Sequence, residues 1–229
     1  SLTWPESERM HPFKTRVVLN YCIVARKNET LWHIALELLK RMTPFVFVSG
    51  VKGYNLTRVI NIAKFLNGEK VEGKFFAMFK NPDALYKFAV ATEDSEILRS
   101  YNTIIEHGAD NIIRQFQNII ATSVQYEGKQ RVASSDVVSL GTCHKVKGLE
   151  FDCVMLANDY VDLMDDEECT GILEAAPGAI DELNMIYVAM TRAKFYLRLS
   201  PMLARYMEET GKQLLYEQNS SDVSHLEEH

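Results

Sequence analysis

Apolar residues in this chain form short, nearly continuous runs that alternate with segments of helical spacing. The run over residues 16–26 is rich in β-branched side chains and predicts a buried strand of a parallel sheet. A helix is expected from Leu31 to Leu39, then a strand over residues 45–48 and a helix over residues 55–66. The N-terminal part therefore predicts the order strand, helix, strand, helix.

The same alternation returns after residue 136. Strands are expected over residues 137–140, followed by a Gly-Thr turn, and over residues 151–157 and 195–199. The clearest helix is expected over residues 181–194, with Asp181 capping its N-terminus. The apolar stripe of this helix is predicted to consist of Leu183, Ile186, Tyr187 and Met190. A final amphipathic helix should start at Pro201, and the last dozen residues are expected to be disordered.

The middle of the chain has a different character. Gly, Asn-Pro and Glu-Gly interrupt helical stretches over residues 83–90, 97–106 and 111–124, which predicts a mostly helical insertion. Strands that alternate with helices on both sides of an insertion indicate an α/β fold with a mainly parallel sheet. Such sheets bind ligands at the carboxyl ends of their strands, so the loops after Val48, Leu140 and Ala157 are the first candidates for a site.

Composition narrows the class of protein. The chain has 229 residues, of which 47% are apolar and 24% are charged, and its net charge is -6. These values are typical of a soluble globular protein and exclude a surface that is basic throughout, so any nucleic-acid contact must be local. No apolar run approaches the roughly 20 residues of a membrane span, and no secretory signal is present, so we expect no membrane contact and an intracellular location. The four cysteines lack paired spacing and are predicted to be reduced thiols, and the start at Ser1 suggests a fragment of a longer protein.

Charge is unevenly distributed along the chain. Residues 40–80 contain eight basic and two acidic side chains, whereas residues 158–182 contain nine acidic side chains and no Lys or Arg. The acidic stretch is interpreted as a solvated surface. The basic stretch has two interpretations, either a solvated surface or a surface that follows the phosphates of a nucleic-acid strand.

Two segments concentrate chemically active side chains. Residues 141–152 (GTCHKVKGLEFD) place a hydroxyl, an imidazole, two ammonium groups and a carboxylate between two strands, and Gly148 is expected to permit a tight turn. Residues 181–194 carry Arg192 about half a turn from the apolar stripe, so that side chain is either a solvated residue or a cation aimed at a phosphate. No G-x-x-x-x-G-K-[ST] phosphate loop occurs, so the chain should not hydrolyse a nucleotide alone.

In combination, these segments resemble motifs V and VI of the UvrD/Rep-like superfamily 1 DNA helicases. Motif V, approximately T-x-H-x-x-K-G-L-E-[WF], is matched by Thr142, His144, Lys147, Gly148, Leu149, Glu150 and Phe151. Motif VI, approximately L-x-Y-V-A-x-T-R-A, is matched by Tyr187, Val188, Ala189, Thr191, Arg192 and Ala193. The lead-in Asp-Glu-Leu-Asn and the earlier Val-Ser-Gly-Val-Lys-Gly-Tyr look most like the F-box DNA helicase branch. Leu183 and Asn184 stand where many members have paired arginines, so a salt-bridge role there is not carried over.

The resemblance implies a fold and a domain organisation. Residues 15–66 and 136–205 would form the second RecA-like motor domain, of the P-loop NTPase type, with a parallel sheet and flanking helices. Residues 67–135 would form a helical insertion subdomain, and residues 206–229 a partly disordered tail. The first RecA-like motor domain, which holds the phosphate loop, would lie N-terminal to this chain in the same protein.

The resemblance also implies roles for individual residues. Arg192 would be the catalytic arginine finger, and Glu150, with Gly148 in the same loop, would contact ATP through the sugar. Thr142 and His144 would contact single-stranded DNA, and Lys147 would serve either the strand or the geometry of the loop. The cofactor would be ATP with Mg²⁺, held mainly by the other motor domain, and no metal site is expected in this chain.

The function implied is the C-terminal motor half of an ATP-dependent DNA helicase or translocase with 3′ to 5′ polarity, of the kind used in DNA repair and recombination. The alternative is a non-catalytic DNA-binding or partner-binding module that keeps the helicase fold. Arg192 argues against that alternative, because a pure binding module has no use for a residue that contacts the γ-phosphate.

Overall fold

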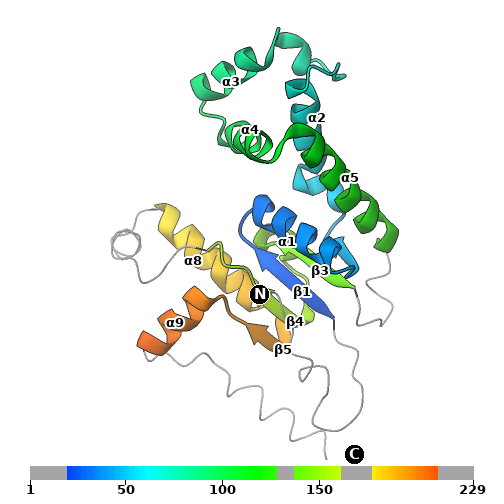
Figure 1. Ribbon diagram of the computed structural model, residues 1–229. Coiled ribbons are helices and arrows are strands. Elements are labelled where there is room, and N and C mark those ends of the chain that lie inside the picture. Colours follow the sequence, from blue (N-terminus) through cyan, green and yellow to red (C-terminus); the bar gives the residue numbers. More distant parts are fainter. Residues whose placement is uncertain (1–19, 128–136, 161–176, 211–229) are drawn as a thin grey trace, which may run out of the picture. The chain divides into compact units, whose positions relative to one another are not determined.

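A computed structural model describes residues 20–127, 137–160 and 177–210 (Figure 1). The chain divides into two compact units, and each is described by itself. The sheet unit comprises Ser1–Leu31 and Gly128–His229, and the helical unit comprises Trp32–Glu127. Among the described residues, no helix is long and apolar enough to cross a membrane. The predicted boundaries of the motor domain and of the insertion stay predictions.

The sheet unit is built on parallel strands. Four of the five described strands lie in the order β3-β1-β4-β5. These strands are β1 (Tyr21–Ala25), β3 (Val138–Thr142), β4 (Phe151–Leu156) and β5 (Ala193–Arg198). Every pairing among them is parallel, with Tyr21 opposite both Val138 and Cys153. The predicted α/β fold with a parallel sheet is confirmed, although Gly141 and Thr142 belong to β3 rather than to the expected turn.

Helices accompany this sheet at three places. The short helix α6 (Cys143–Val146) follows β3, α8 (Pro177–Met190) packs against β4, β5 and α6, and α9 (Pro201–Thr210) follows β5 (Figure 1). The start of α8 differs from the prediction, because Pro177 occupies the first turn, where its fixed φ suits a helix. Asp181 therefore lies inside α8 and is not its N-cap, and the helix ends at Met190 rather than Lys194.

The apolar stripe predicted for α8 is partly wrong. Ile186 and Ala189 are buried, whereas Leu183 is 38% exposed and Tyr187 is 68% exposed. The buried face also carries Glu182, whose carboxylate accepts hydrogen bonds from Arg26. This polar anchor and the small Ala189 set the rotation of the helix, so two large apolar residues face away from the sheet.

The helical unit contains β2 and most of the remaining helices. Its elements are β2 (Phe45–Phe47), η2 (Val51–Tyr54), α2 (Leu56–Leu66), η3 (Phe76–Met78), α3 (Pro82–Ala91), α4 (Ser95–His107) and α5 (Ala109–Tyr126). The helix α1 (Asn28–Lys40) crosses the boundary between the two units. The three helical stretches expected in the middle of the chain are confirmed as α3, α4 and α5, each within a few residues of its predicted limits.

Side-chain caps and buried aromatic rings explain why these helices form. The Asn81 carboxamide oxygen caps α3, and the Asp94 carboxylate caps α4 by accepting hydrogen bonds from two backbone amides. Inside the unit, the Trp32 and Phe116 rings lie 5.3 Å apart, and the Ser123 hydroxyl accepts a hydrogen bond from the Phe47 amide. A second aromatic cluster consists of Phe65, Phe75, Phe76, Phe79 and Phe88.

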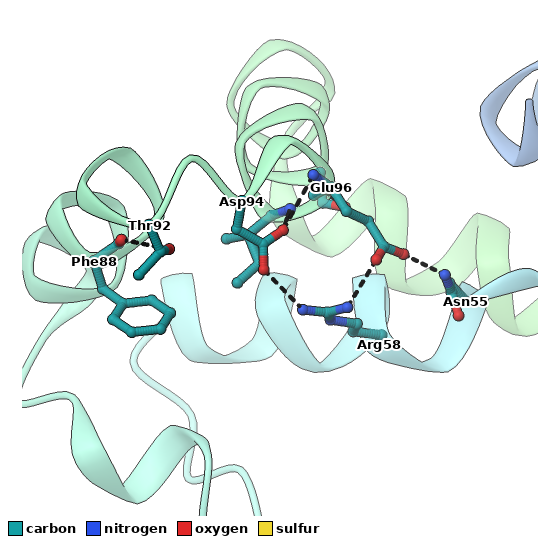
Figure 2. Close-up of polar contacts among 8 residues, drawn as sticks. Asn55, Arg58, Phe88, Thr92, Asp94 and Glu96 are labelled. Carbon is teal, nitrogen blue, oxygen red and sulfur yellow. Dashed lines mark hydrogen bonds and ion pairs between the residues drawn. The ribbon is translucent and has the colours of Figure 1, made fainter. Parts of the chain in front are cut away.

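An ionic clamp joins α2 to the start of α4 (Figure 2). Arg58 donates to the Glu96 carboxylate at 2.8 Å and to the Asp94 carboxylate at 3.4 Å, while the Asn55 amide donates to Glu96. Arg58 belongs to the basic stretch, and so does Lys40, which pairs with Glu37 at 2.7 Å. The charge of these two residues is thus balanced within the unit, which favours the solvated-surface interpretation for them.

Candidate functional site

The parallel strands give the sheet two edges with different loops. The carboxyl edge is where β1, β3 and β4 end, since Ala25 pairs with Thr142 and Val24 with Leu156. The amino edge is where β4 and β5 begin, and there Phe151 pairs with Ala193. The five residues of β1 separate the two edges by about 16 Å.

The polar loop over residues 143–150 runs from one edge to the other. A connection between parallel strands must cross back from the end of one strand to the start of the next, and this segment does so between β3 and β4. The sequence places all of its polar residues at the carboxyl edge, but the structure leaves only the start of the loop there. Glu150 and Arg192, which precede β4 and β5, lie at the amino edge.

After β3, the first five residues of the loop include both buried and exposed side chains. Thr142 ends β3 and is 8% exposed, and Val146 is buried, whereas His144 and Lys147 are exposed. The Leu149 amide donates to the Val146 carbonyl at 2.9 Å, which closes the turn after α6. The imidazole and the ammonium group are therefore accessible to a ligand, and the Thr142 hydroxyl is much less so.

The expected turn at Gly148 is confirmed. Its φ of +81° lies in the left-handed region, which glycine adopts without the cost that a side chain would add. Apart from Gly148 itself and its two neighbours in the chain, no heavy atom of the described residues lies within 4 Å of the position that a Cβ would take, so the backbone conformation rather than space requires glycine here.

A buried latch holds α6 against β1. The Cys143 thiol lies 3.2 Å from the Tyr160 hydroxyl, which donates to the Val24 carbonyl at 3.2 Å. Burial raises the pKa of both the Cys143 thiol and the Tyr160 hydroxyl, so both groups are neutral at physiological pH. Cys22, Cys143 and Cys153 are reduced thiols, as predicted, and all three are buried, while Cys169 lies outside the described residues.

A second polar cluster at the carboxyl edge escaped the sequence-based reasoning. The Arg26 guanidinium forms a two-pronged ion pair with Glu182 of α8, with Nε 2.6 Å from Oε2, and this pairing raises the pKa of Arg26. The Asp159 carboxylate accepts hydrogen bonds from the Arg26 and Lys27 amides at 2.9 to 3.1 Å. A signal was present, because Arg26 and Asp159 each follow a buried strand closely.

At the amino edge, Arg192 connects α8 to the end of the loop. Its guanidinium donates to the Val188 carbonyl at 2.9 Å, to the Leu149 carbonyl at 3.2 Å and to the Thr191 hydroxyl at 2.9 Å. Within the part of the chain that the structure describes, these bonds use three of the five N–H groups of the side chain, which leaves two for a ligand. Because Arg192 is only half-buried, a phosphate oxygen can reach those two donors.

Glu150 lies beside Arg192 in the chain fold but makes only a weak contact. Its carboxylate is 3.4 Å from the Lys194 ammonium, and the side chains are 64% and 46% exposed. An ion pair with this exposure contributes little to stability. The carboxylate therefore remains accessible to a hydroxyl of a bound ligand.

Comparison with known proteins identifies the family. The model of the UvrD-like helicase C-terminal domain matches residues 77–203, which is more than half of the chain and includes both the loop and Arg192. The chain belongs to this family. As a UvrD-like helicase C-terminal domain, it has β3, β4 and β5 inside the matched region and β1 with Arg26 outside it.

Two relatives agree with the predicted F-box helicase branch. The UvrD-like chain is 27% identical to F-box DNA helicase 1 of Gallus gallus over 209 residues, which cover 84% of this chain and 20% of that protein. It is 30% identical to F-box DNA helicase protein 1 of Schizosaccharomyces pombe over 126 residues, which cover 53% of this chain and 13% of that protein. The chain thus spans about a fifth or less of the length of these relatives.

Proposed function

We propose that this chain is the C-terminal motor half of an ATP-dependent DNA helicase or translocase, working with an N-terminal RecA-like domain of the same protein. The observation that carries the proposal is the Arg192 guanidinium, which three acceptors fix while two N–H groups stay available. A guanidinium that is already oriented can neutralise the charge that develops on a transferred phosphoryl group. Such arginine fingers accelerate hydrolysis by about 10³ to 10⁵.

The residues at the amino edge fit a nucleotide that another domain holds. Arg192 would meet the terminal phosphate, and the exposed Glu150 carboxylate would accept hydrogen bonds from the sugar hydroxyls. Gly148 would set the direction of the loop that presents Glu150. As the family resemblance implies, Mg²⁺ would be held mainly by the other motor domain.

The residues at the end of β3 and in the first part of the loop fit a single strand of DNA. His144 would stack on a base or donate a hydrogen bond, and Lys147 would contact a phosphate. Thr142 is largely buried, so it would either contact the DNA through the small exposed part of its hydroxyl or fix the conformation of the loop. One segment of seven residues then joins the strand contact at His144 to the nucleotide contact at Glu150, so a shift at one end would displace the other.

The test is single-turnover ATP hydrolysis by the full-length protein carrying Arg192→Ala, with and without single-stranded DNA. We expect hydrolysis to fall by about 10³ or more while ATP binding persists, because the finger acts mainly on the transition state. The matched control is Arg114→Ala, since Arg114 is an exposed arginine of α5 that makes one hydrogen bond to Asn111. The isolated chain should be inactive.

The second candidate function is a non-catalytic DNA-binding or partner-binding module. The same three hydrogen bonds favour it, because they give Arg192 a structural role at the end of α8. Under this candidate, Arg192→Ala would lower the unfolding midpoint and leave hydrolysis by the full-length protein unchanged. That result would reject the motor proposal.

A further inference from the structure

The second aromatic cluster of the helical unit reaches the protein surface. Phe76 is buried, whereas Phe75, Phe79 and Phe88 are half-buried and Met78 is 64% exposed. The Met78 amide donates to the Phe75 carbonyl at 3.3 Å, and side chains three residues apart in such a 3₁₀ turn lie on the same face. Apolar side chains that are exposed together mark interaction surfaces. The cluster therefore presents an apolar area that a partner can cover.

Lysines adjoin this apolar area. Three rings of the cluster have a lysine as a direct neighbour in the chain, in the pairs Lys64–Phe65, Lys74–Phe75 and Phe79–Lys80. Lys74 and Lys80 are exposed, and residues 64–80 contain four lysines against two glutamates. Among the described residues, no ion pair involves Lys64, Lys74 or Lys80, in contrast to the paired basic residues of α1 and α2. The positive charge beside the cluster is thus available to a partner.

The packing of the rings favours one class of partner. The bases of a nucleic-acid strand bind proteins by stacking on open ring faces. Phe75 and Phe79 instead pack on each other and on Phe88, with ring centroids 5.2 to 6.1 Å apart and interplanar angles of 60° to 75°. Met78 has no flat face on which a base can stack, but its flexible side chain adapts well to the apolar side chains of a protein. A protein segment therefore fits this area better than a nucleic-acid strand.

The charge of the area specifies what kind of segment fits. Apolar side chains of the partner would cover Met78 and the exposed parts of the rings, while carboxylates would pair with the lysines. An amphipathic helix with acidic residues beside its apolar face supplies both groups at once. We name Phe75, Met78, Phe79, Lys74 and Lys80 the Phe-Lys surface.

We propose that the Phe-Lys surface binds an acidic amphipathic helix of a partner protein. All of its residues belong to the helical unit, so the inference goes beyond the proposed motor function and does not rest on it. Binding of this kind would give the basic stretch a role that neither a solvated surface nor a surface following phosphates describes.

The first test selects ligands by their chemistry. A displayed library of random peptides is selected on the full chain, and the affinity of the enriched peptides is measured by fluorescence anisotropy for the wild type and for Met78→Ser. We expect acidic residues beside apolar residues at helical spacing, and a loss of about tenfold in affinity in Met78→Ser with an unchanged unfolding midpoint. Met42→Ser is the matched control, because Met42 is a 90% exposed methionine outside the surface, and it should bind as the wild type does.

Three results of this selection would overturn the proposal. These are a selection without any enriched peptide, enriched peptides without an excess of acidic residues, and an affinity that Met78→Ser leaves unchanged.

A second test separates a protein partner from a nucleic acid. The double variant Lys74→Glu and Lys80→Glu should weaken binding of the selected peptide about tenfold at low salt and less as the salt concentration rises. Lys52→Glu, at an exposed lysine of η2, should bind the peptide normally. A short single-stranded DNA oligonucleotide should not displace the peptide. If the oligonucleotide displaces it, and Met78→Ser weakens DNA binding as much as peptide binding, the surface binds nucleic acid and the proposal is wrong.

Discussion

The two edges of the sheet each carry an arginine and a carboxylate, but these groups have different partners. At the carboxyl edge, the Arg26 guanidinium forms a two-pronged ion pair with Glu182, and the Asp159 carboxylate accepts hydrogen bonds from two backbone amides. At the amino edge, the acceptors that hold Arg192 among the described residues are all neutral, and the ion pair of Glu150 is exposed and long. An arginine that keeps its charge uncompensated can respond to an incoming anion, whereas one already paired with a carboxylate must first lose that partner.

This difference predicts that changes at the amino edge affect the chemical step and changes at the carboxyl edge affect DNA binding or stability. The variants below either separate the two edges or show that they act as one.

The largest effect is expected for Arg192→Lys in the full-length protein. Lysine keeps the charge, but its single ammonium group cannot bond the Val188 carbonyl, the Leu149 carbonyl and a phosphate in fixed directions. Single-turnover hydrolysis should therefore fall on the order of 10³-fold, nearly as far as in Arg192→Ala. If the lysine variant hydrolyses ATP at the wild-type rate, a positive charge alone is sufficient for hydrolysis, and the fixed orientation of Arg192 has no role in it.

A smaller effect is expected at the carboxyl edge from His144→Ala. Loss of one stacking or hydrogen-bonding contact should weaken single-stranded DNA binding about tenfold, measured by fluorescence anisotropy. Hydrolysis without DNA should stay unchanged, because His144 lies at the opposite end of the loop from Glu150. His33→Ala, at an exposed histidine of α1, is the control that should bind DNA normally.

Tyr160→Phe should lower the stability of the fold and leave ligand binding unchanged. The variant removes the hydroxyl that donates to the Val24 carbonyl and contacts the Cys143 thiol, while the Val24 carbonyl keeps the Ala157 amide as a donor at 2.9 Å. We expect the free energy of unfolding to fall by about 0.5 to 1.5 kcal/mol, measured by denaturant titration. Tyr86→Phe, at a partly exposed ring, should lower the free energy of unfolding by less. An equal loss in both variants would show that the Tyr160 hydroxyl makes no special contribution to stability.

The smallest effect is expected from the Glu150 and Lys194 pair. Lys194→Met removes a surface ion pair and should change the free energy of unfolding by less than about 1 kcal/mol. Glu150→Gln should have an equally small effect on stability but should raise the KM for ATP, because it weakens the proposed contact with the sugar. Equal KM values for the two variants would assign Glu150 to the ion pair alone.

The sequence was sufficient to predict most of the regular elements, although not the short helix α6, because most strands and helices carry their own apolar period. The strand β1 is an unbroken apolar run, β4 is interrupted only by Asp152, and α4 has an Asp cap in front of a helical period. What the sequence could not provide is the pairing of distant residues. Arg26 and Glu182 are 156 positions apart, and no local pattern indicates that they meet.

Two predictions about the site were wrong because the sequence pattern does not show where a residue lies relative to the sheet. Both motif segments were found from their residues, but the loop was assigned to one edge, since nothing in its composition shows that it crosses the sheet. The rotation of α8 was also missed, because Leu183 and Tyr187 fit an apolar stripe as well as Ile186 does. The roles of Thr142, His144, Lys147, Gly148, Glu150 and Arg192 stay predictions until the variants are measured.

The length of α8 has a mechanical consequence. Its 14 residues span about 21 Å, with Glu182 at the sixth position and the Arg192 anchor two residues beyond the last, about 15 Å from Glu182 along the axis. An α-helix is stiff over this distance, so it behaves as a lever whose two ends cannot move independently. Release of Arg26 from Glu182 at one edge would tilt the guanidinium at the other, and the lever would carry that signal without any rearrangement of the sheet.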